Sequence, residues 1–316
     1  MNILITGAAG NLGGFLARDM LGGPHRLKLM THRTELAPDL AAAPNTEVLR
    51  CDLDRPDTLV PACQDTDAIV HFAGVLFAPG PERFLPHTNV EYVRNLARVA
   101  VAHGVRKLIL VSFPHVEGES TVEHPAAGKP EGEPPTSVHA RTRLAAEHVI
   151  RETCEGTDTT PVLLRPGMIY GREVLMIAAA RWCAEHHLLA VWRKPTQIHL
   201  ISLPDFNACV RAAVEDEAVS GIYNLGDDAP TTLQRFLDTA CRHWGCARPW
   251  RFPRFLFFVA AWCVETYARI FRTKAPLTRD FIRIGMQSYV MDTSRMKAEL
   301  RAELTHPRLE NGLDLL

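Results

Sequence analysis

The sequence predicts an α/β fold: a Rossmann-type doubly wound parallel sheet with a smaller, mainly helical C-terminal substrate region. Short aliphatic or β-branched runs alternate with stretches of helical periodicity as far as Arg165, which is typical of parallel strands joined by crossover helices. A glycine-rich turn follows the first run directly, and the pattern loosens after Arg165. We therefore expect a dinucleotide-binding domain over 1–170 and a substrate-binding region over 171–316, with residues near 198–226 returning to the first domain.

Each element follows from its periodicity and flanking residues. The expected strands are Asn2–Ile5, Leu27–Thr31, Glu47–Arg50, Ala68–Phe72, Lys107–Ser112 and Pro161–Arg165. The expected helices are Leu12–Leu21, Pro56–Cys63, Asn89–His103, Ser137–Glu155, Val174–His186, Thr231–His243, Arg254–Phe271 and Thr278–Gln287. The stretch Glu117–Thr136 is rich in Gly, Pro and Glu, which predicts a long surface loop beside the mouth of the sheet.

Composition excludes several classes of function. The chain has 35 basic and 36 acidic residues, so no broad electrostatic field favours nucleic acid or an anionic membrane, and a small-molecule ligand is expected. The eight cysteines contain no CxxC pair and are expected to be small buried apolar residues in a reducing cytoplasm. No signal peptide is expected before the first strand. The histidines lack metal-ligand spacing, so we predict no metal site.

The first turn carries a phosphate-binding pattern. Gly7, Gly10 and Gly13 stand between the first strand and the first helix. Gly7 permits a tight turn, Gly10 permits close approach of a pyrophosphate, and Gly13 permits close packing of helix and strand. The free amides at the helix N-terminus attract phosphate. The turn therefore predicts a dinucleotide site, in which Ala9, Asn11 and Leu12 also take part.

The end of the second strand bears on the choice between NADP and NAD. An acid there would accept a hydrogen bond from the 2′-hydroxyl of NAD. The sequence has His32 and Arg33 instead, with no carboxylate before Glu35. Arg33 can form a forked pair with a 2′-phosphate, helped by His32. NADP is the expected cofactor, NAD stays open, and Arg33 as a plain solvated charge is the alternative.

Further motifs occur in a recognisable order. They are Cys51-Asp52-Leu53, His71-Phe72-Ala73-Gly74, Asn89-Val90, Arg165-Pro166-Gly167-Met168-Ile169-Tyr170-Gly171 and Tyr223-Asn224-Leu225-Gly226. With the glycine turn, they resemble the extended short-chain dehydrogenase/reductase family, the NAD(P)-dependent epimerase/dehydratase and 3β-hydroxysteroid dehydrogenase-like group. The resemblance implies cofactor contacts from Asp52, Leu53, Phe72, Ala73, Gly74, Asn89, Arg143 and Pro166. It also implies a homodimer formed through the helices Asn89–His103 and Ser137–Glu155.

The active-site motif departs from the family pattern. The flanks of the YxxxK helix match, but His139 stands at the Tyr position and Arg143 at the Lys position. The family's Ser position falls on Phe113, or on Ser112 if the alignment shifts by one residue. We name His139, Arg143 and Ser112 as the candidate catalytic residues. His139 can act as an acid near neutral pH, although the positive charge of Arg143 should lower its pKa; the alternative is that His139 is an exposed helix residue without a catalytic role.

Other groups could donate a proton near the cofactor. They are Tyr92, His115, His124 and Tyr170, of which Tyr170 is expected to be structural and the two histidines solvated. No GxSxG turn or Cys-His pairing indicates hydrolysis.

Three functions remain open. The first is an NADP-dependent oxidoreductase acting on a carbonyl or alcohol of a small apolar substrate. The second is a non-catalytic NADP-binding redox sensor or scaffold, and the third is a sugar-nucleotide epimerase or dehydratase. The apolar run Phe255–Val264 is too short to span a bilayer. We expect it to pack against the protein's own core or a hydrophobic substrate, with attachment to a membrane surface as the alternative.

Overall fold

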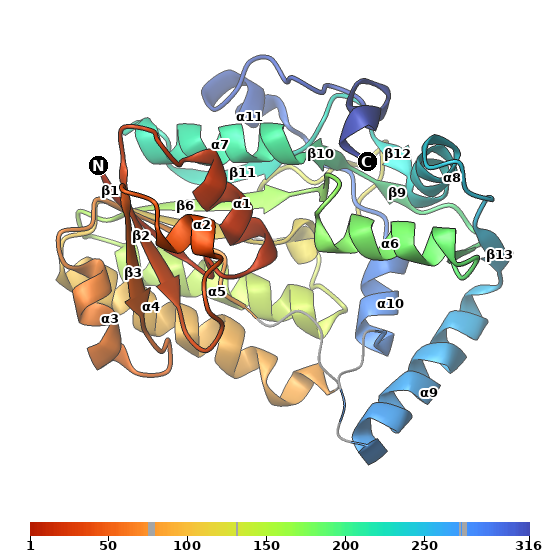
Figure 1. The fold of residues 1–316 in the computed structure, drawn as a ribbon, viewed down its shortest axis with the longest axis horizontal. Coiled ribbons are helices and arrows are strands. Elements are labelled where there is room, and N and C mark those ends of the chain that lie inside the picture. Colours follow the sequence, from red (N-terminus) through yellow and green to blue (C-terminus); the bar gives the residue numbers. More distant parts are fainter. Residues whose placement is uncertain (75–79, 131, 272, 274–276) are drawn as a thin grey trace.

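The centre of the protein is a seven-stranded parallel sheet (Figure 1). The structure, a computed structural model, describes residues 1–74, 80–130, 132–271, 273 and 277–316. The strand order is β11-β6-β5-β4-β1-β2-β3. The strands are β1 (Asn2–Thr6), β2 (Arg26–Thr31), β3 (Thr46–Arg50), β4 (Ala68–His71), β5 (Lys107–Val111), β6 (Thr160–Pro166) and β11 (Gly221–Leu225). The fold class and all six strands expected in the first half are confirmed.

Except at the edge strand β3, the sheet is buried on both faces, which explains its nearly continuous apolar strands. In β1, Ile3 and Ile5 belong to the core on one side of the sheet, whereas Leu4 belongs to the core on the other. Successive strand residues point to opposite faces, so one run of aliphatic residues contributes to two cores.

Helices cover the two faces (Figure 1). One face packs against α3 (Pro56–Cys63), α4 (Tyr92–Ala102) and α5 (Val138–Cys154), and the other against α1 (Asn11–Asp19) and α7 (Leu203–Glu215). A six-residue π-helix, Pro86–Glu91, leads into α4. The pairing of α4 and α5 in a homodimer stays a prediction.

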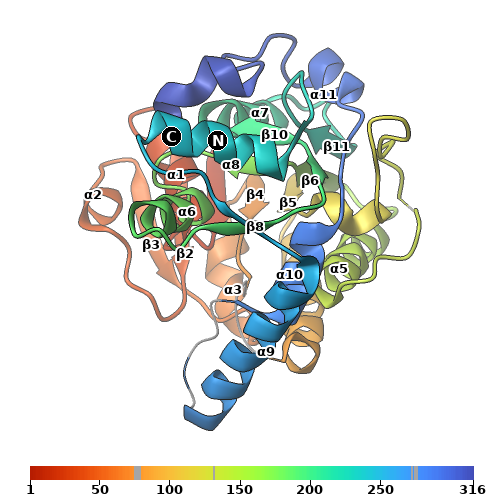
Figure 2. The ribbon, with the colours of Figure 1, turned by 90° about the vertical axis from the view of Figure 1, so that its right-hand side faces the viewer.

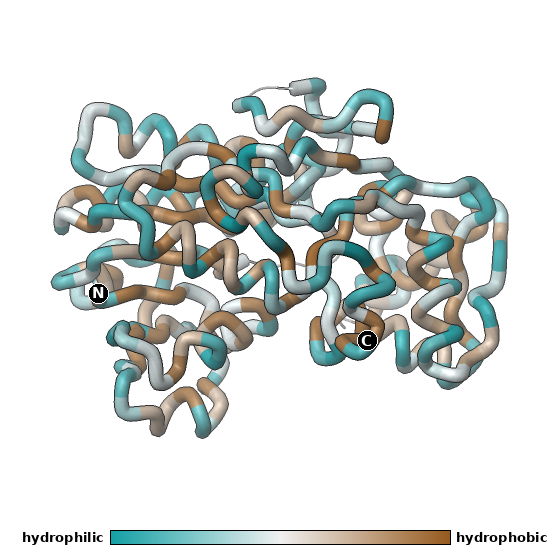
Figure 3. Tube along the Cα trace, turned by 90° about the horizontal axis from the view of Figure 1, so that it is seen from above, coloured by the Kyte–Doolittle hydropathy of each residue, from teal (hydrophilic) through white to brown (hydrophobic). Residues whose placement is uncertain are grey.

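The C-terminal half adds smaller elements. Its helices are α6 (Leu175–Glu185), α8 (Leu233–His243), α9 (Arg254–Phe271), α10 (Arg279–Met286) and α11 (Ser294–Glu299). Three two-stranded sheets pair β7 (Met168–Tyr170) with β10 (Leu200–Ser202), β9 (Gln197–Ile198) with β12 (Thr231–Thr232), and β8 (Ala190–Trp192) with β13 (Trp250–Phe252). The chain ends lie apart, the N-terminus beside the strands of the main sheet and the C-terminus nearer the middle (Figures 1 and 3).

The sequence prediction missed several elements. The largest is α7, which packs its buried Phe206 and Val210 into the core beside the sheet. Its start has a recognisable pattern, because the Ser202 side chain accepts a hydrogen bond from Asp205 N and a proline follows in the first turn. The short helices α2 (Pro38–Ala41) and α11 were also missed.

The stretch Glu117–Thr136 is not simply a surface loop. Its described part contains buried residues, among them Ser120 and Ala126. Ala126 N donates to Val290 O at 2.8 Å, which ties this stretch to the chain after α10.

The apolar helix α9 meets its expectation only in part, because Phe257 and Phe258 pack against the core. Most of its large apolar side chains are exposed instead of packing against the core, and its Cys263 is the one exposed cysteine of the eight. All eight cysteines are free. No helix in the described part of the chain combines the length and apolar character needed to cross a membrane.

Candidate functional site

The glycine turn joins β1 to α1 in a conformation that requires glycine. Gly7 has φ +70°, and a methyl group there would lie 3.0 Å from Ala73 N. A methyl group at Gly13 would lie 2.5 Å from Gly7 O. Helix α1 therefore packs directly on the turn, and its N-terminus opens at the carboxyl end of the sheet with Gly10 as the N-cap. Free amides and a partial positive charge at such a helix end suit a pyrophosphate.

Asn11 fixes the turn to the C-terminal region. Its Nδ2 donates to Glu173 O and its Oδ1 accepts from Leu175 N, both at 2.9 Å. Leu12 packs on the core, and Ala9 is half-buried. The residues of the turn are thus positioned by packing and by the start of α6.

The structure brings the two predicted adenosine-side segments together. His32 Nε2 lies 3.5 Å from Asp52 Oδ2, which joins the end of β2 to the residues after β3. Arg33 is exposed at the end of β2 and forms no ion pair with the described residues. Leu53 is buried and its carbonyl accepts from Asn95 Nδ2 at 2.9 Å. Arg33 is therefore free to meet an anionic ligand.

A cluster of buried polar side chains lies at the ends of β4 and α5. His71 Nδ1 shares a 2.8 Å hydrogen bond with Thr6 Oγ1. Asn89, on the π-helix, donates from Nδ2 to Thr142 Oγ1 at 3.0 Å. A methyl group at Gly74 would lie 2.7 Å from Arg143 Nη2 and 3.6 Å from Asn89 Oδ1. These side chains come from separate elements and meet beside the strand that neighbours the glycine turn.

Four polar atoms of this region are buried without a hydrogen-bond partner among the described residues. They are His71 Nε2, Asn89 Oδ1, His139 Nε2 and Arg143 Nη1. An unsatisfied buried polar group destabilises a protein by about 1–3 kcal/mol. Such a concentration of unsatisfied groups is expected where a polar ligand completes the hydrogen bonding.

His139 is buried, not exposed on its helix. It lies in the first turn of α5, where Ser137 caps the helix and the Asp280 carboxylate accepts from the amides of Val138 and His139 at 3.2 and 3.4 Å. Burial, together with the charge of Arg143 one turn away, lowers the pKa of His139 to about 4. The expectation that Arg143 lowers this pKa agrees in direction, but burial is the larger cause.

Arg143 is a buried cation with no ion pair among the described residues. Burial lowers its pKa to about 10, opposed by the charge of Glu147. It stays charged at neutral pH, and together with burial it lowers the pKa of His71 to about 3. The Arg143 guanidinium is therefore a strong hydrogen-bond donor whose Nη1 has no acceptor among the described residues.

Ser112 is occupied by a structural network. Its Oγ donates to Glu147 Oε1, and Glu147 pairs with Arg165 at 3.1 and 2.5 Å. Arg165 also donates to Glu117 Oε1 at 2.6 Å, and all three charged side chains are buried. The Ser112 hydroxyl thus donates its hydrogen bond to a structural carboxylate, which favours a positioning role.

Phe113 contacts two histidine rings of the site. Its ring lies 6.2 Å from the His139 ring and stacks on His115 at 4.8 Å. His115 in turn lies 4.6 Å from the Tyr289 ring. His115 is buried, which corrects the expectation of a solvated side chain, and burial lowers its pKa to about 4. The aromatic side of the site is therefore Phe113, His115 and Tyr289.

The remaining sequence candidates lie elsewhere or are structural. Tyr170 is fully buried, and burial raises its pKa. His124 is exposed. Phe72 is half-buried and packs edge-on against Phe206, while Pro166 ends β6. In the described ranges, no group of three or more His, Cys, Asp or Glu side chains is arranged to bind a metal ion.

Sequence reasoning missed Glu147, Asp280 and Tyr289. Glu147 follows Arg143 by one turn, so helical spacing could have placed it on the same face of α5. Asp280 and Tyr289 lie more than 130 residues after His139 in the chain. No local pattern links them to the site.

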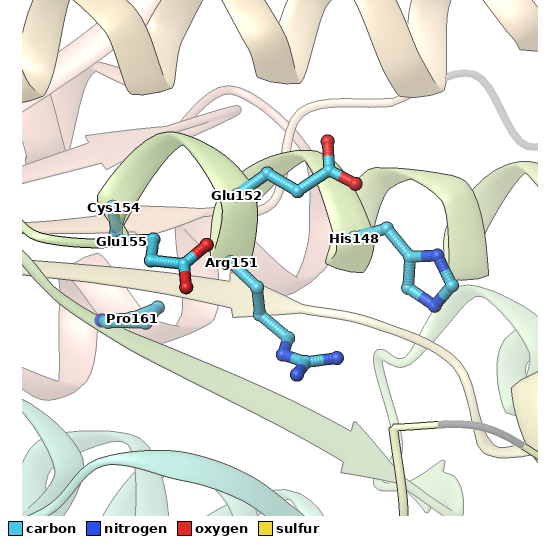
Figure 4. A pocket seen from close by; sticks show the side chains of 6 residues that line it. All are labelled: His148, Arg151, Glu152, Cys154, Glu155 and Pro161. Atoms are coloured by element: carbon cyan, nitrogen blue, oxygen red, sulfur yellow. The ribbon is translucent and has the colours of Figure 1, made fainter.

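Two cavities lie outside the polar cluster. One, of about 430 Å³, is bordered by the second half of α5, where His148, Arg151 and Glu152 point away from the helix (Figure 4). His148 is nine residues beyond His139, about 13 Å along the helix. The other, of about 590 Å³, is lined by Lys194, Arg254, Phe258, Arg283, Met286, Gln287 and six further residues. The Gln287 carbonyl also faces the His115 ring, so this cavity and the aromatic side of the site share a wall.

Comparison with known proteins gives one family and several partial relatives. The model of the NAD dependent epimerase/dehydratase family matches residues 3–226. A uronate dehydrogenase of Pseudomonas putida is 35% identical over 116 residues, 37% of this chain and 42% of that protein. A 2-alkyl-3-oxoalkanoate reductase of Stenotrophomonas maltophilia is 30% identical over 176 residues, 54% of this chain and 52% of that protein. The matched stretches thus span about half of these relatives or less.

Among solved structures, the chain is similar to a UDP-glucose 4-epimerase of Thermotoga maritima. The TM-score is 0.78 at 16% identity, and the match covers 100% of this chain and 97% of the other. The likeness supports the doubly wound fold.

Proposed function

The chain belongs to the NAD dependent epimerase/dehydratase family, and from this premise we propose that it is an NADP-dependent oxidoreductase. It interconverts a carbonyl and an alcohol on an apolar substrate, with His139 in place of the family's Tyr. The observation that carries the proposal is a set of four buried polar atoms, from His71, Asn89, His139 and Arg143, that have no hydrogen-bond partner in the described part of the chain. They lie at the carboxyl ends of the strands, where ligands bind in open α/β sheets.

The residues present fit a dinucleotide along this edge. The α1 N-terminus would bind the pyrophosphate, and Arg33 would bind the 2′-phosphate of NADP through charge-assisted hydrogen bonds. At the nicotinamide end, Asn89 Oδ1 would accept a hydrogen bond from the ribose or the amide, and Arg143 Nη1 would donate one to an oxygen of either group. When bound, the nicotinamide ring supplies or accepts the hydride.

His139 handles the proton of the substrate oxygen. With a pKa of about 4, its imidazole is neutral at pH 7, and only about one molecule in a thousand carries the acid form. The neutral ring can accept the proton of an alcohol that is being oxidised. Carbonyl reduction needs the imidazolium, so its rate should rise as the pH falls toward 4.

Arg143 orients the ligand and does not move protons. Its guanidinium stays charged, so it cannot relay a proton as the family's Lys does. It lies one turn from His139 on the same face of α5. A planar donor at this point binds hydroxyl or amide oxygens and keeps His139 in its neutral form.

The substrate class follows from the surroundings of His139. Phe113, His115 and Tyr289 present rings on this side of the site. The adjoining cavity combines Phe258 and Met286 with basic side chains such as Arg254, which suits an apolar chain with an anionic end. The partial relative named 2-alkyl-3-oxoalkanoate reductase supports the same class.

The test combines binding and turnover. We expect wild type to bind NADPH and to reduce long-chain 3-oxo acids faster at pH 5.5 than at pH 7.5. His139→Gln should lower kcat by about 100-fold, the lower range for loss of a general acid or base, and leave NADPH binding in place. His148→Gln, on the second half of the same helix, is the control and should not change kcat. Unchanged turnover in His139→Gln would contradict the assigned role.

A second candidate is a cofactor-binding protein without catalysis. The alignment that puts Phe113 at the family's Ser position, with Ser112 as the alternative, favours this function, because a phenyl ring cannot hydrogen-bond a substrate oxygen. Tight NADPH binding, with no turnover of oxo acids, ketones, aldehydes or UDP-sugars, would support this function. Turnover of UDP-glucose without net oxidation would instead indicate the sugar-nucleotide epimerase.

A further inference from the structure

Helix α9 exposes most of its large apolar residues, unlike an ordinary surface helix. Its buried positions are Ala261, Glu265 and Ala268, and Glu265 accepts from Arg279 N and Nε at 2.7 and 2.8 Å. The side facing the protein thus combines two alanines and a carboxylate with the half-buried rings of Phe257 and Phe258. Surface helices normally direct their apolar stripe toward the core.

The apolar residues of α9 face outward. Phe255 is 63% exposed, Trp262 56% and Ile270 67%. The exposed apolar set, called here the α9 apolar face, is Phe255, Leu256, Val259, Trp262, Tyr267, Ile270 and Phe271. Both ribbon views show α9 running along the rim of the molecule and extending beyond the body (Figures 1 and 2). A contiguous apolar surface of this kind marks an interaction site.

The charge around α9 indicates what kind of partner the α9 apolar face binds. The described residues of 251–283 include five arginines, at 251, 254, 269, 279 and 283, and two acids, Glu265 and Asp280, whereas the whole chain has a net charge of −1. Both acids are engaged, Glu265 with Arg279 and Asp280 with the amides of Val138 and His139. Arg251 pairs with Asp238, while Arg254, Arg269 and Arg283 form no ion pair with the described residues. The helix therefore presents aromatic and aliphatic side chains within a basic surround, the combination that binds anionic lipid surfaces.

We propose that α9 docks the protein on an anionic lipid surface, with the α9 apolar face inserted among the headgroups and neighbouring basic side chains paired with lipid phosphates. The contact is peripheral and leaves the rest of the fold outside the bilayer. The cavity lined by Arg254 and Phe258 is bordered by the first turns of α9, so the docked helix brings this cavity next to the lipid. The proposal does not depend on the reaction at His139.

The first experiment is cosedimentation of the full chain with vesicles. We expect binding to vesicles of equal parts phosphatidylcholine and phosphatidylglycerol, weaker binding to phosphatidylcholine alone, and release at high salt. The double variant Phe255→Glu, Trp262→Glu should reduce binding at least tenfold. Val48→Glu is the matched control, since Val48 is also exposed but lies on β3, far from α9 (Figure 1).

A probe on wild-type α9 covers the case in which the double variant does not fold. Cys263 is exposed on α9 and can be labelled with an environment-sensitive dye after Cys183 and Cys246 are replaced by serine. The dye emission should shift to shorter wavelength when mixed vesicles are added. The emission of the same dye, attached to Val48→Cys in a chain that also carries Cys263→Ser, should not change.

Three outcomes would overturn the proposal. They are absence of binding to the mixed vesicles, equal binding by wild type and a folded double variant, and a wild-type dimer that the double variant dissociates without any vesicle binding. The last would assign the α9 apolar face to a second copy of the chain. Circular dichroism and NADPH binding report whether each variant folds.

Discussion

Arg143 follows His139 by one turn on the buried face of α5. Its charge, which forms no ion pair with the residues that the structure describes, adds to burial in lowering the pKa of the His139 imidazole to about 4. In the proposed site, this pair stands at the family's Tyr and Lys positions and combines a neutral base at pH 7 with a donor that cannot lose its proton. The chemistry proposed for the site depends on this relationship.

Removing the charge of Arg143 should raise the pKa of His139. In Arg143→Gln we expect the pKa to move upward but to stay below 6.5, because burial is the larger cause of the shift. The pH above which the rate of carbonyl reduction decreases should rise together with the pKa of His139. Titration of the His139 ring signals by NMR measures the pKa directly, and Arg143→Lys is the control that keeps the charge. An identical pKa in the Gln and Lys variants would show that the charge has no effect.

Gly13→Ala should disrupt the glycine turn. The methyl group would lie 2.5 Å from Gly7 O, a backbone atom that cannot rotate away, and overpacking of this kind typically costs about 1–3 kcal/mol. NADPH affinity should fall by about tenfold or more, since about 1.4 kcal/mol corresponds to a factor of ten. Gly14→Ala is the control, because its methyl group would meet Ala8 O at 3.3 Å. Calorimetric titration that gives equal affinities would contradict a phosphate site at this turn.

Arg33→Ala should remove the preference for NADPH. A charge-assisted hydrogen bond contributes about 1.5–3 kcal/mol, so we expect NADPH affinity to fall by about 10- to 100-fold while NADH affinity stays the same. Fluorescence titration with both cofactors measures the ratio. Arg26→Ala changes an exposed arginine at the other end of the same strand, paired with Glu47, and should alter neither affinity. If wild type binds NADH as tightly as NADPH, the chain does not select the 2′-phosphate.

Glu147→Gln should destabilise the fold. Glu147 pairs with Arg165 in the buried network, and breaking a buried ion pair costs about 3–5 kcal/mol in the free energy of unfolding. Glu185→Gln breaks an exposed pair with Arg181 and should cost less than about 1 kcal/mol. Urea unfolding followed by circular dichroism separates the two.

Ser112→Ala distinguishes a structural role from a catalytic one in the same network. Loss of one hydrogen bond to a carboxylate should lower the free energy of unfolding by about 1.5–3 kcal/mol without changing kcat. A large fall in kcat with unchanged stability would restore Ser112 to the catalytic set.

The strands and most helices could be predicted because their patterns are local. Strands such as Lys107–Val111 are aliphatic after their first residue, and the glycine turn stands between a strand and a helix. Helix α7 was missed because its apolar residues are interrupted by polar ones that become buried in tertiary contacts, among them Asp205 and Asn207. Its capping serine was the available local evidence.

The sequence by itself determined the doubly wound sheet, the glycine turn and Arg33 at the end of the second strand, and it predicted His139 and Arg143 at the family's Tyr and Lys positions. Only the tertiary structure decided the burial, the hydrogen bonds and the protonation of these side chains. Burial and a carboxylate from α10 surround His139, Glu147 occupies the Ser112 hydroxyl, and the apolar side of α9 is exposed. Periodicity depends on neighbours a few residues apart, whereas burial and pKa depend on side chains brought together from distant parts of the chain.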